Sequence, residues 1–417
     1  MELVGALLFA GAVLHTFSTH YFERLAESSP RHAGLWHWLG EVEVVFGTWA
    51  LVLCLFMVYA LGPKATIDYL ESRNYTEPLF VFAIMVMAAT RPVLYLAEAL
   101  MRTLARGLPW ASQTSLYFLG LALLPLLGSL ITEPAAMTLA ALSLRATAFT
   151  PAMPARLKYL TLGVLFVNVS IGGTLTPFAA PPVLMVAAAW QWDIAFMWTV
   201  FGSKTVVVVL LNAGLATLVC RRALAAPGSA EPGPAGATVP SVPWPMVLVH
   251  LVFLVLVVRL AHHPVVFLGL FLFFLGFVTA YPRHQDPLIL RQALLVAFFL
   301  AGLVVLGGWQ AWWLEPLLMR LSADKVFYGA LALTAFTDNA ALTYLATLVE
   351  GLSLEFKTAL VSGAVLGGGL TVIANAPNPA GAALLKDCFA HQAIHPLGLL
   401  LAALPPTLLG VLVFRWI

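Results

Sequence analysis

The sequence predicts an all-α polytopic membrane protein with two inverted repeats and about ten crossings of the bilayer. Of its 417 residues, 61% are hydrophobic and 10% are charged, and the mean hydropathy is +0.94, far from the balance of a water-soluble domain. Apolar runs of about twenty residues, each long enough to cross as a helix, recur along the chain. The third observation is a set of paired interruptions in these runs, which occur at corresponding places in the two halves.

Hydropathy predicts eight simple spans. The first lacks the basic start and the small-residue cleavage site of a secretory signal, so we expect it to remain as a helix. The eight spans are expected near 2–22, 39–62, 78–104, 195–220, 244–261, 264–281, 288–307 and 395–416.

Four further apolar segments are interrupted near their middles. Glycine, proline, threonine, acids and amides stand where a continuous helix would need apolar residues. We interpret 114–147 and 326–351 as re-entrant hairpins, and 158–190 and 357–386 as broken transmembrane helices. Irregular backbone at membrane depth is tolerated only inside protein or beside a water-filled cavity, so each interruption indicates a site.

A soluble connector divides the chain into two halves. Residues 225–245 are rich in proline, glycine and alanine, which predicts a flexible loop. We therefore expect a first repeat over 1–224 and a second over 246–417.

Two motifs recur in the same order in both halves. TEPAAMT at 132–138 aligns with TDNAALT at 337–343, and GGTLTPFAAPP at 172–182 aligns with GGGLTVIANAP at 367–377. Chance similarity between alanine-rich stretches is the alternative explanation. Two matches in one order favour an internal repeat, and paired breaks of this kind are the best sequence indication of a transporter's binding site.

The distribution of basic residues gives a topology. If the hairpins return to their side of entry and the broken helices cross, each half makes five crossings, and the second half is inverted. Twelve loop lysines and arginines then lie on one side of the membrane and seven on the other. The positive-inside rule makes the first side cytoplasmic, so both termini face outward.

The interruptions carry the residues of a candidate sodium and proton site. A carboxylate at the membrane centre costs several kcal/mol, so Glu133 and Asp338 are expected to serve a cation, a proton or a basic partner. Such acids could hold sodium when ionised and release it when protonated. The alternative is that an acid caps a half-helix or pairs with a base. The other candidate oxygen donors are Thr132, Thr176, Thr337, Asn339, Thr371, Asn375 and Asn378.

Other charges leave alternatives open. Arg91 and Glu98 lie two turns apart in one expected span, which allows an ion pair within that helix or with a neighbour, or a role in substrate binding. Lys204 could extend to the membrane interface or reach the acid pair. Glu41 and Glu43 are expected to be interfacial, although a proton-entry role is possible.

Several classes of protein are excluded by composition. The net charge of +2 leaves no basic surface for nucleic acid. There is no phosphate-binding loop for ATP, and the three cysteines are too far apart to indicate a disulfide framework or a zinc site. We expect no cofactor.

At these motifs the sequence resembles the ion transporter superfamily. The run SIGGTLTPFAAPP at 170–182 is similar to its glycine-rich, proline-rich break, and FTDN at 336–339 resembles the hairpin tip of its antiporter and arsenite-exporter branches. The chain most resembles the bacterial sodium/proton antiporter family, which is related to divalent anion/sodium symporters. The resemblance implies a scaffold domain and a mobile transport domain with an elevator-like movement, often in a dimer. The symporters' Ser-Asn-Thr tips are absent here, and the first break lacks an asparagine.

The sequence thus predicts a secondary active transporter that exchanges sodium for protons across the bacterial inner membrane. It would contact small inorganic ions and lipid, form a homodimer and perform no enzymatic reaction. The alternative is a sodium- or proton-coupled carrier of a small anion that uses Arg91, Lys204 and the hairpin amides. An intramembrane enzyme or a channel is a further alternative, but no nucleophile or metal cluster accompanies the acids.

Overall fold

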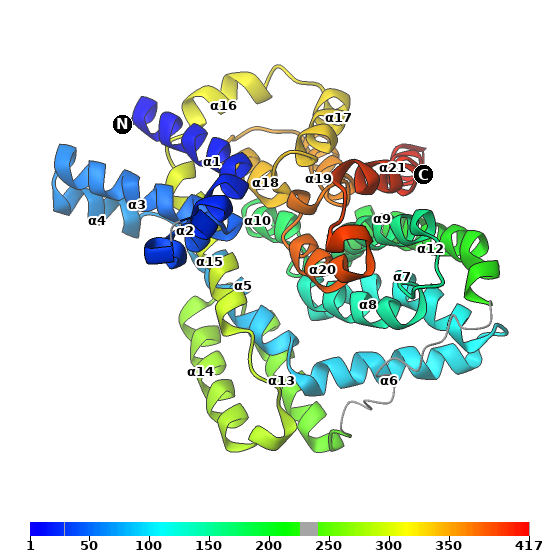
Figure 1. Ribbon diagram of the computed structural model, residues 1–417. Helices are drawn as coiled ribbons and strands as arrows, with labels where there is room; N and C mark the ends of the chain where they lie inside the picture. The colour runs from blue at the N-terminus through cyan, green and yellow to red at the C-terminus, as the bar shows by residue number, and fades with distance from the viewer. Residues whose placement is uncertain (29, 226–240, 417) are drawn as a thin grey trace.

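The computed structural model describes residues 1–28, 30–225 and 241–416, and every regular element in these ranges is helical (Figure 1). The expected connector at 225–245 falls largely on residues 226–240, which lie outside the described ranges. An all-helical chain is the expected outcome, because a helix satisfies its backbone hydrogen bonds within one segment in a lipid environment.

In the described part of the first half there are twelve α-helices. In chain order they are α1 (Glu2–Ser28), α2 (Ala33–Gly40), α3 (Val42–Leu61), α4 (Pro63–Glu71), α5 (Thr76–Ala88), α6 (Arg91–Gly107), α7 (Ser112–Ile131), α8 (Glu133–Thr147), α9 (Ala155–Gly172), α10 (Pro181–Trp190), α11 (Ile194–Met197) and α12 (Ser203–Leu224). A π-helical turn (Trp198–Gly202) joins α11 to α12, and a short 3-10 turn (Gly173–Leu175) extends α9.

The second half has a similar order of helices. These are α13 (Trp244–Arg259), α14 (Pro264–Ala280), α15 (Leu290–Gly307), α16 (Ala311–Leu318), α17 (Ala323–Thr334), α18 (Asn339–Thr347), α19 (Leu354–Gly367), α20 (Asn378–Leu385) and α21 (Pro396–Trp416). Short 3-10 turns lie at Pro30–His32, Pro282–His284, Val372–Ala374, Lys386–Cys388 and Ala390–Gln392.

The helices form two groups that meet along one boundary. The α3–α15 group comprises α1, α3, α5, α13, α14 and α15, and the hairpin group comprises α7–α10, α12 and α17–α21. Figure 1 shows the α3–α15 group on the left and the hairpin group on the right. Packing is extensive within each group. Helix α6 connects the groups by packing on both α7 and α13, whereas α5 and α15 make smaller contacts with α8, α10 and α18 across the boundary.

The second half-helix of each break packs on the hairpin of the other half. Helix α10 lies against α18, and α20 lies against α8. Helices of the two halves also pack on each other in the α3–α15 group. There α1 packs on α3 of its own half and on α15 of the second half, and α13 packs on α14 of its own half and on α5 of the first half. The two halves are therefore interleaved and do not form two separate bodies.

Six helices in the described ranges are long and apolar enough to cross a membrane, and the pair α5–α6 is a seventh candidate. Several other expected spans form shorter apolar helices, including Trp244–Arg259 and Pro264–Ala280. The chain is thus a multi-pass membrane protein, and the figure of ten crossings stays a prediction.

The expected simple span at 78–104 is wrong, because the chain bends by 63° between α5 and α6. Thr90 is extended at this point, and its hydroxyl donates to the carbonyl oxygen of Met87 across 2.7 Å. Pro92 has no N–H to continue the hydrogen-bond ladder of α5, and a proline in a first turn suits a new helix.

Candidate ion-binding site

The first hairpin tip is a one-residue break between α7 and α8. Thr132 has φ 72°, a conformation that costs a β-branched residue roughly 1–3 kcal/mol. The chain reverses there, so that a Cβ on Gly128 would lie 3.2 Å from the Cβ of Ala136. Glu133 is consequently the first residue of α8, and it is completely buried.

The second tip presents its acid differently. Asp338 is the N-cap of α18, and its Oδ1 accepts hydrogen bonds from the backbone N–H groups of Ala340 (2.8 Å) and Ala341 (3.2 Å). The capping alternative raised from the sequence is therefore part of its role. Oδ2 accepts no hydrogen bond from the described residues, and Asp338 is only partly buried, so this oxygen remains for another partner.

In each break, a threonine that the sequence predicted as a candidate ligand forms a hydrogen bond with the hairpin of the same half. Thr176 donates to the carbonyl oxygen of Ser129 across 2.6 Å, and Thr371 donates to that of Ala335 across 2.9 Å. Both carbonyls lie just before a tip. Each of these threonines therefore holds its break within about one turn of the hairpin tip.

Two equivalent glycines let the tips approach the breaks. A Cβ on Gly173 would overlap Oε1 of Glu133 and lie 2.8 Å from its Cγ. A Cβ on Gly368 would lie 2.8 Å from Nδ2 of Asn339 and would overlap Oγ of Ser170. A larger residue would therefore displace the side chain of Glu133 at the first position and those of Ser170 and Asn339 at the second.

The two halves meet at Asn375. Its Nδ2 donates to Oε2 of Glu133 across 2.8 Å, so an amide of the second break supports the acid of the first hairpin. Asn378, three residues later, uses its Nδ2 to bind the carbonyl oxygens of Gly368 (2.7 Å) and Thr371 (2.8 Å).

Several buried oxygens in this region have no hydrogen-bond partner among the described residues. Buried polar atoms are almost always satisfied, so a group of exceptions within one site requires an explanation. Carboxylate, amide and hydroxyl oxygens are the ligands that hard cations prefer. The unpartnered oxygens are Thr132 Oγ1, Glu133 Oε1, Asn339 Oδ1, Asn375 Oδ1 and Asn378 Oδ1.

A small pocket with a cavity volume of about 30 Å³ lies beside this region at the boundary between the two helix groups. The α3–α15 group contributes Glu43, Val296 and Phe299, and the hairpin group contributes Asp338, Ile373, Asn375, Ala376 and Pro379. A second pocket, which includes Thr132, shares Val296 and Ala376 with the first. No basic side chain lines either pocket.

The candidate ligands predicted from the sequence differ in burial and in hydrogen bonding. Thr337 is partly exposed and donates to the carbonyl oxygen of Leu333, outside the group of unpartnered oxygens. The sequence did not predict that Glu43 and Asp338 line the same pocket. The feature that could have indicated it is an acidic residue at the start of an apolar span. In the described ranges no three acidic, histidine or cysteine side chains form a metal cluster, so amide and hydroxyl oxygens would have to complete a cation's shell.

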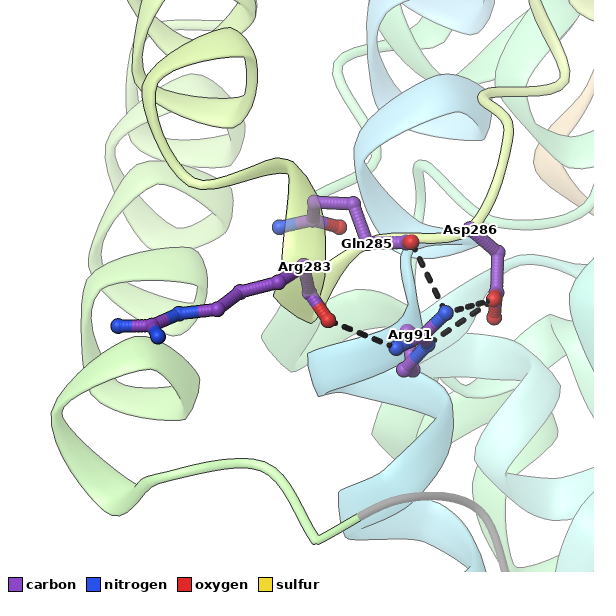
Figure 2. Close-up of polar contacts among 4 residues, drawn as sticks. All are labelled: Arg91, Arg283, Gln285 and Asp286. Carbon is purple, nitrogen blue, oxygen red and sulfur yellow. Dashed lines mark hydrogen bonds and ion pairs between the residues drawn. The ribbon is translucent and has the colours of Figure 1, made fainter.

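The remaining charges lie away from the tips. Figure 2 shows Arg91 bound to the loop after α14, where it pairs with Asp286 and donates to the carbonyl oxygens of Gln285 (2.9 Å) and Arg283 (3.1 Å). Arg91 therefore pairs with a neighbouring segment. Glu98 instead pairs with Arg102 of its own helix.

Lys204 donates to the carbonyl oxygen of Phe414, in the last turn of α21, across 3.3 Å. Its ammonium group therefore supports the end of that helix and does not reach the acid pair. The anion-carrier alternative used Arg91, Lys204 and the hairpin amides. Arg91 and Lys204 are bound elsewhere, whereas Nδ2 of Asn339 at the second tip is buried and has no hydrogen-bond partner among the described residues.

A family model described as "Putative Na+/H+ antiporter" matches residues 1–417, the whole chain. The chain belongs to this family. Membership makes it a transporter and not an enzyme, and small inorganic ions are the transported species that the family implies. No match was found among curated proteins.

Proposed function

We propose that this antiporter exchanges sodium for protons at the region where the two hairpin tips meet the two breaks. The observation that carries the proposal is the set of buried, unpartnered oxygens around the Asn375–Glu133 hydrogen bond. These oxygens match the preference of a monovalent hard cation. The tips offer no basic group for an anion.

Glu133 and Asp338 carry the exchange in this proposal. Each carboxylate binds either a sodium ion or a proton, so the two cations compete for the same negative charge. Amide oxygens of Asn339, Asn375 and Asn378 complete the sodium shell, whereas a proton needs none of them. Sodium and protons are the cargo of this site, and the proposal requires no resident cofactor.

We further propose that the two halves are inverted repeats with five crossings each. The exchange of packing partners supports this, because α10 contacts α18 as α20 contacts α8. The placement of Gly173 and Gly368 at equivalent tip contacts also supports it. The excess of basic residues in the loops expected to be cytoplasmic favours outward-facing termini in the bacterial inner membrane.

The movement is proposed to be of the elevator type. The hairpin group carries the candidate ligands as one packed unit, whereas the α3–α15 group supplies the opposite wall of the pocket. The smaller contacts across this boundary suit a surface that slides. We propose that a homodimer surrounded by lipid holds the α3–α15 group in place.

The proposal is tested in proteoliposomes that contain an internal pH indicator. Addition of external sodium to vesicles with an acidic interior is expected to raise the internal pH, and an equal concentration of choline is not. Lithium, potassium and candidate anions are compared in the same assay. Protein-free vesicles and vesicles with Asp338→Asn are the controls. A pH change that is independent of sodium, or that requires an added anion, would contradict the proposal.

A further inference from the structure

Glu43 is an acid in an apolar pocket with no basic partner. It is the second residue of α3 and is half-buried. Glu41, two residues earlier, forms an ion pair with Arg291 of α15, whereas Glu43 forms no ion pair with the described residues. Glu43 instead lines the pocket that also contains Asp338.

The walls between these two acids are apolar. The apolar residues that line the pocket together with Glu43 and Asp338 are Val296, Phe299, Ile373, Ala376 and Pro379. Negative charge in such surroundings is costly unless a positive charge compensates it. No lysine or arginine is among the described residues that line this pocket, and the nearby Arg291 is already paired with Glu41, so a cation from solution can neutralise the acids inside it.

A buried amide oxygen in the same pocket is a further candidate ligand for a cation. Asn375 is 1% exposed and lines the same pocket, and its Oδ1 has no hydrogen-bond partner. Its Nδ2 is fixed by Glu133, so the amide orientation leaves Oδ1 as the free atom. The pocket thus combines two carboxylates with a buried, unpartnered amide oxygen.

We propose that Glu43, Asp338 and Asn375 form a sodium-binding subsite in this pocket, which shares Asp338 and Asn375 with the proposed exchange site and adds Glu43 to it. The inference rests on the proposed exchange function and assigns it a third carboxylate, from outside the hairpins. Water molecules complete the coordination shell on the open side of the pocket.

The three ligands of this subsite come from both helix groups. Glu43 belongs to the α3–α15 group, whereas Asp338 and Asn375 belong to the hairpin group. A sodium ion bound here connects the two groups across their boundary. Asn375 also contacts Glu133, so the ion lies one side chain away from the buried acid.

The test measures equilibrium binding of radioactive sodium to the purified full-length chain in detergent. Glu43→Gln keeps the size of the side chain and removes its charge, and we expect it to weaken sodium affinity about tenfold. Glu43→Asp keeps the charge and is expected to stay within about threefold of the unmodified protein. Glu98→Gln is the matched control, because Glu98 pairs with Arg102 away from the pocket, and no change is expected.

A second measurement leaves Glu43 unaltered in case the glutamine variant does not fold. Ala376→Cys is introduced after Cys54, Cys220 and Cys388 are replaced by serine, and its labelling by a methanethiosulfonate reagent is timed. Sodium is expected to slow labelling at least threefold relative to choline, because the bound ion fills the pocket. Equal labelling rates would overturn the proposal.

The outcomes separate this inference from the exchange function. If Glu43→Gln binds sodium as tightly as the unmodified protein while proteoliposomes still show sodium-driven pH changes, the subsite is refuted and the exchange function stands. If the unmodified protein neither binds sodium nor changes internal pH, both are refuted. A loss of affinity in Glu43→Gln and not in Glu98→Gln supports the subsite.

Discussion

Asn375 and Glu133 are 242 positions apart in the sequence, yet the amide of the first donates to the carboxylate of the second across 2.8 Å. This bond joins the break of the second half to the hairpin tip of the first. The candidate ligands therefore come from both halves of the chain, and the acid at the first tip is bound by a side chain from the second half.

Asn375→Ala is expected to weaken sodium affinity roughly tenfold or more. The substitution removes a hydrogen bond to a charged group, which is worth about 1.5–3 kcal/mol, and a candidate cation ligand. Asn74→Ala is the control, because Asn74 is exposed and binds only the backbone of Thr76. Ala180→Asn, at the matching place in the first break, is expected to change sodium dependence less than Asn375→Ala. Equal effects of these two changes would contradict an asymmetric site.

Asp338→Asn is expected to abolish exchange and to leave a stable protein. Asparagine caps a helix as well as aspartate does, so the hydrogen bonds from Ala340 and Ala341 can remain while the charge is lost. Asp338→Ala should also lose the cap and about 1 kcal/mol of stability. Thermal unfolding separates the two variants. Wild-type exchange rates in Asp338→Asn would refute the mechanism, and an equal loss of stability in both variants would refute the capping role.

Glu133→Gln is expected either to abolish exchange or to uncouple sodium from protons. Glutamine can still accept the hydrogen bond from Asn375, so the tip should keep its shape, but it cannot bind and release a proton. Transport of radioactive sodium and the change of internal pH are measured on the same vesicles. A variant that retains both at wild-type rates would show that Asp338 alone carries the exchange.

Sodium affinity is expected to fall as the pH falls. Protons and sodium ions compete for the same carboxylates, so each added proton removes a negative charge that sodium needs. Binding is measured between pH 6 and pH 9, and the apparent dissociation constant should rise toward the acidic end. Asp338→Asn should flatten this dependence. An affinity that does not change with pH in the unmodified protein would argue against a shared site.

Local patterns in the sequence indicated the residues of the candidate site. The acid after a threonine at each tip and the glycine pairs at each break are short-range features, and in the structure each break lies against its own hairpin. The expectation of a continuous helix over 78–104 failed because hydropathy averages over the bend. Thr90, Arg91 and Pro92 were a visible signal for it, since proline favours a first turn.

The pocket itself could not be predicted in this way. Glu43 and Asp338 are brought together by packing between helices that are distant in sequence, and neither residue's neighbours encode that contact. The same holds for the Asn375–Glu133 bond. Arg91 was considered beside Glu98 because they share a helix, whereas its actual partner, Asp286, follows a different helix.

Gly173→Ala is expected to impair sodium binding and to destabilise the protein by about 1–3 kcal/mol. The added methyl group would overlap the side chain of Glu133, which is held in place by Asn375. Gly214→Ala is the matched control, because a Cβ at that position of α12 meets no atom within 4 Å. It should be neutral or slightly stabilising, as alanine favours a helix over glycine. Thermal unfolding and sodium binding of both variants check this, and identical behaviour would refute the close approach.

The elevator movement predicts that fixing the boundary between the helix groups stops transport. Val296 of α15 and Ala376 after the second break line both pockets, so they face each other across this boundary. Val296→Cys and Ala376→Cys are combined in a chain whose three native cysteines are replaced by serine. A short bifunctional thiol reagent is expected to join them and to reduce exchange to the level of protein-free vesicles.

Each single-cysteine variant treated with the same reagent is the control, because it can be modified but not joined to a second site. Cleavage of the link by a reductant, with a disulfide-containing reagent, should restore exchange if the block is mechanical. Sodium binding should survive in the linked protein, since Asp338 and Asn375 stay beside Glu43 when the two groups are held in the present arrangement. Undiminished exchange in fully linked protein would mean that the hairpin group does not move relative to α15, and that access to the site changes by local opening of the tips instead.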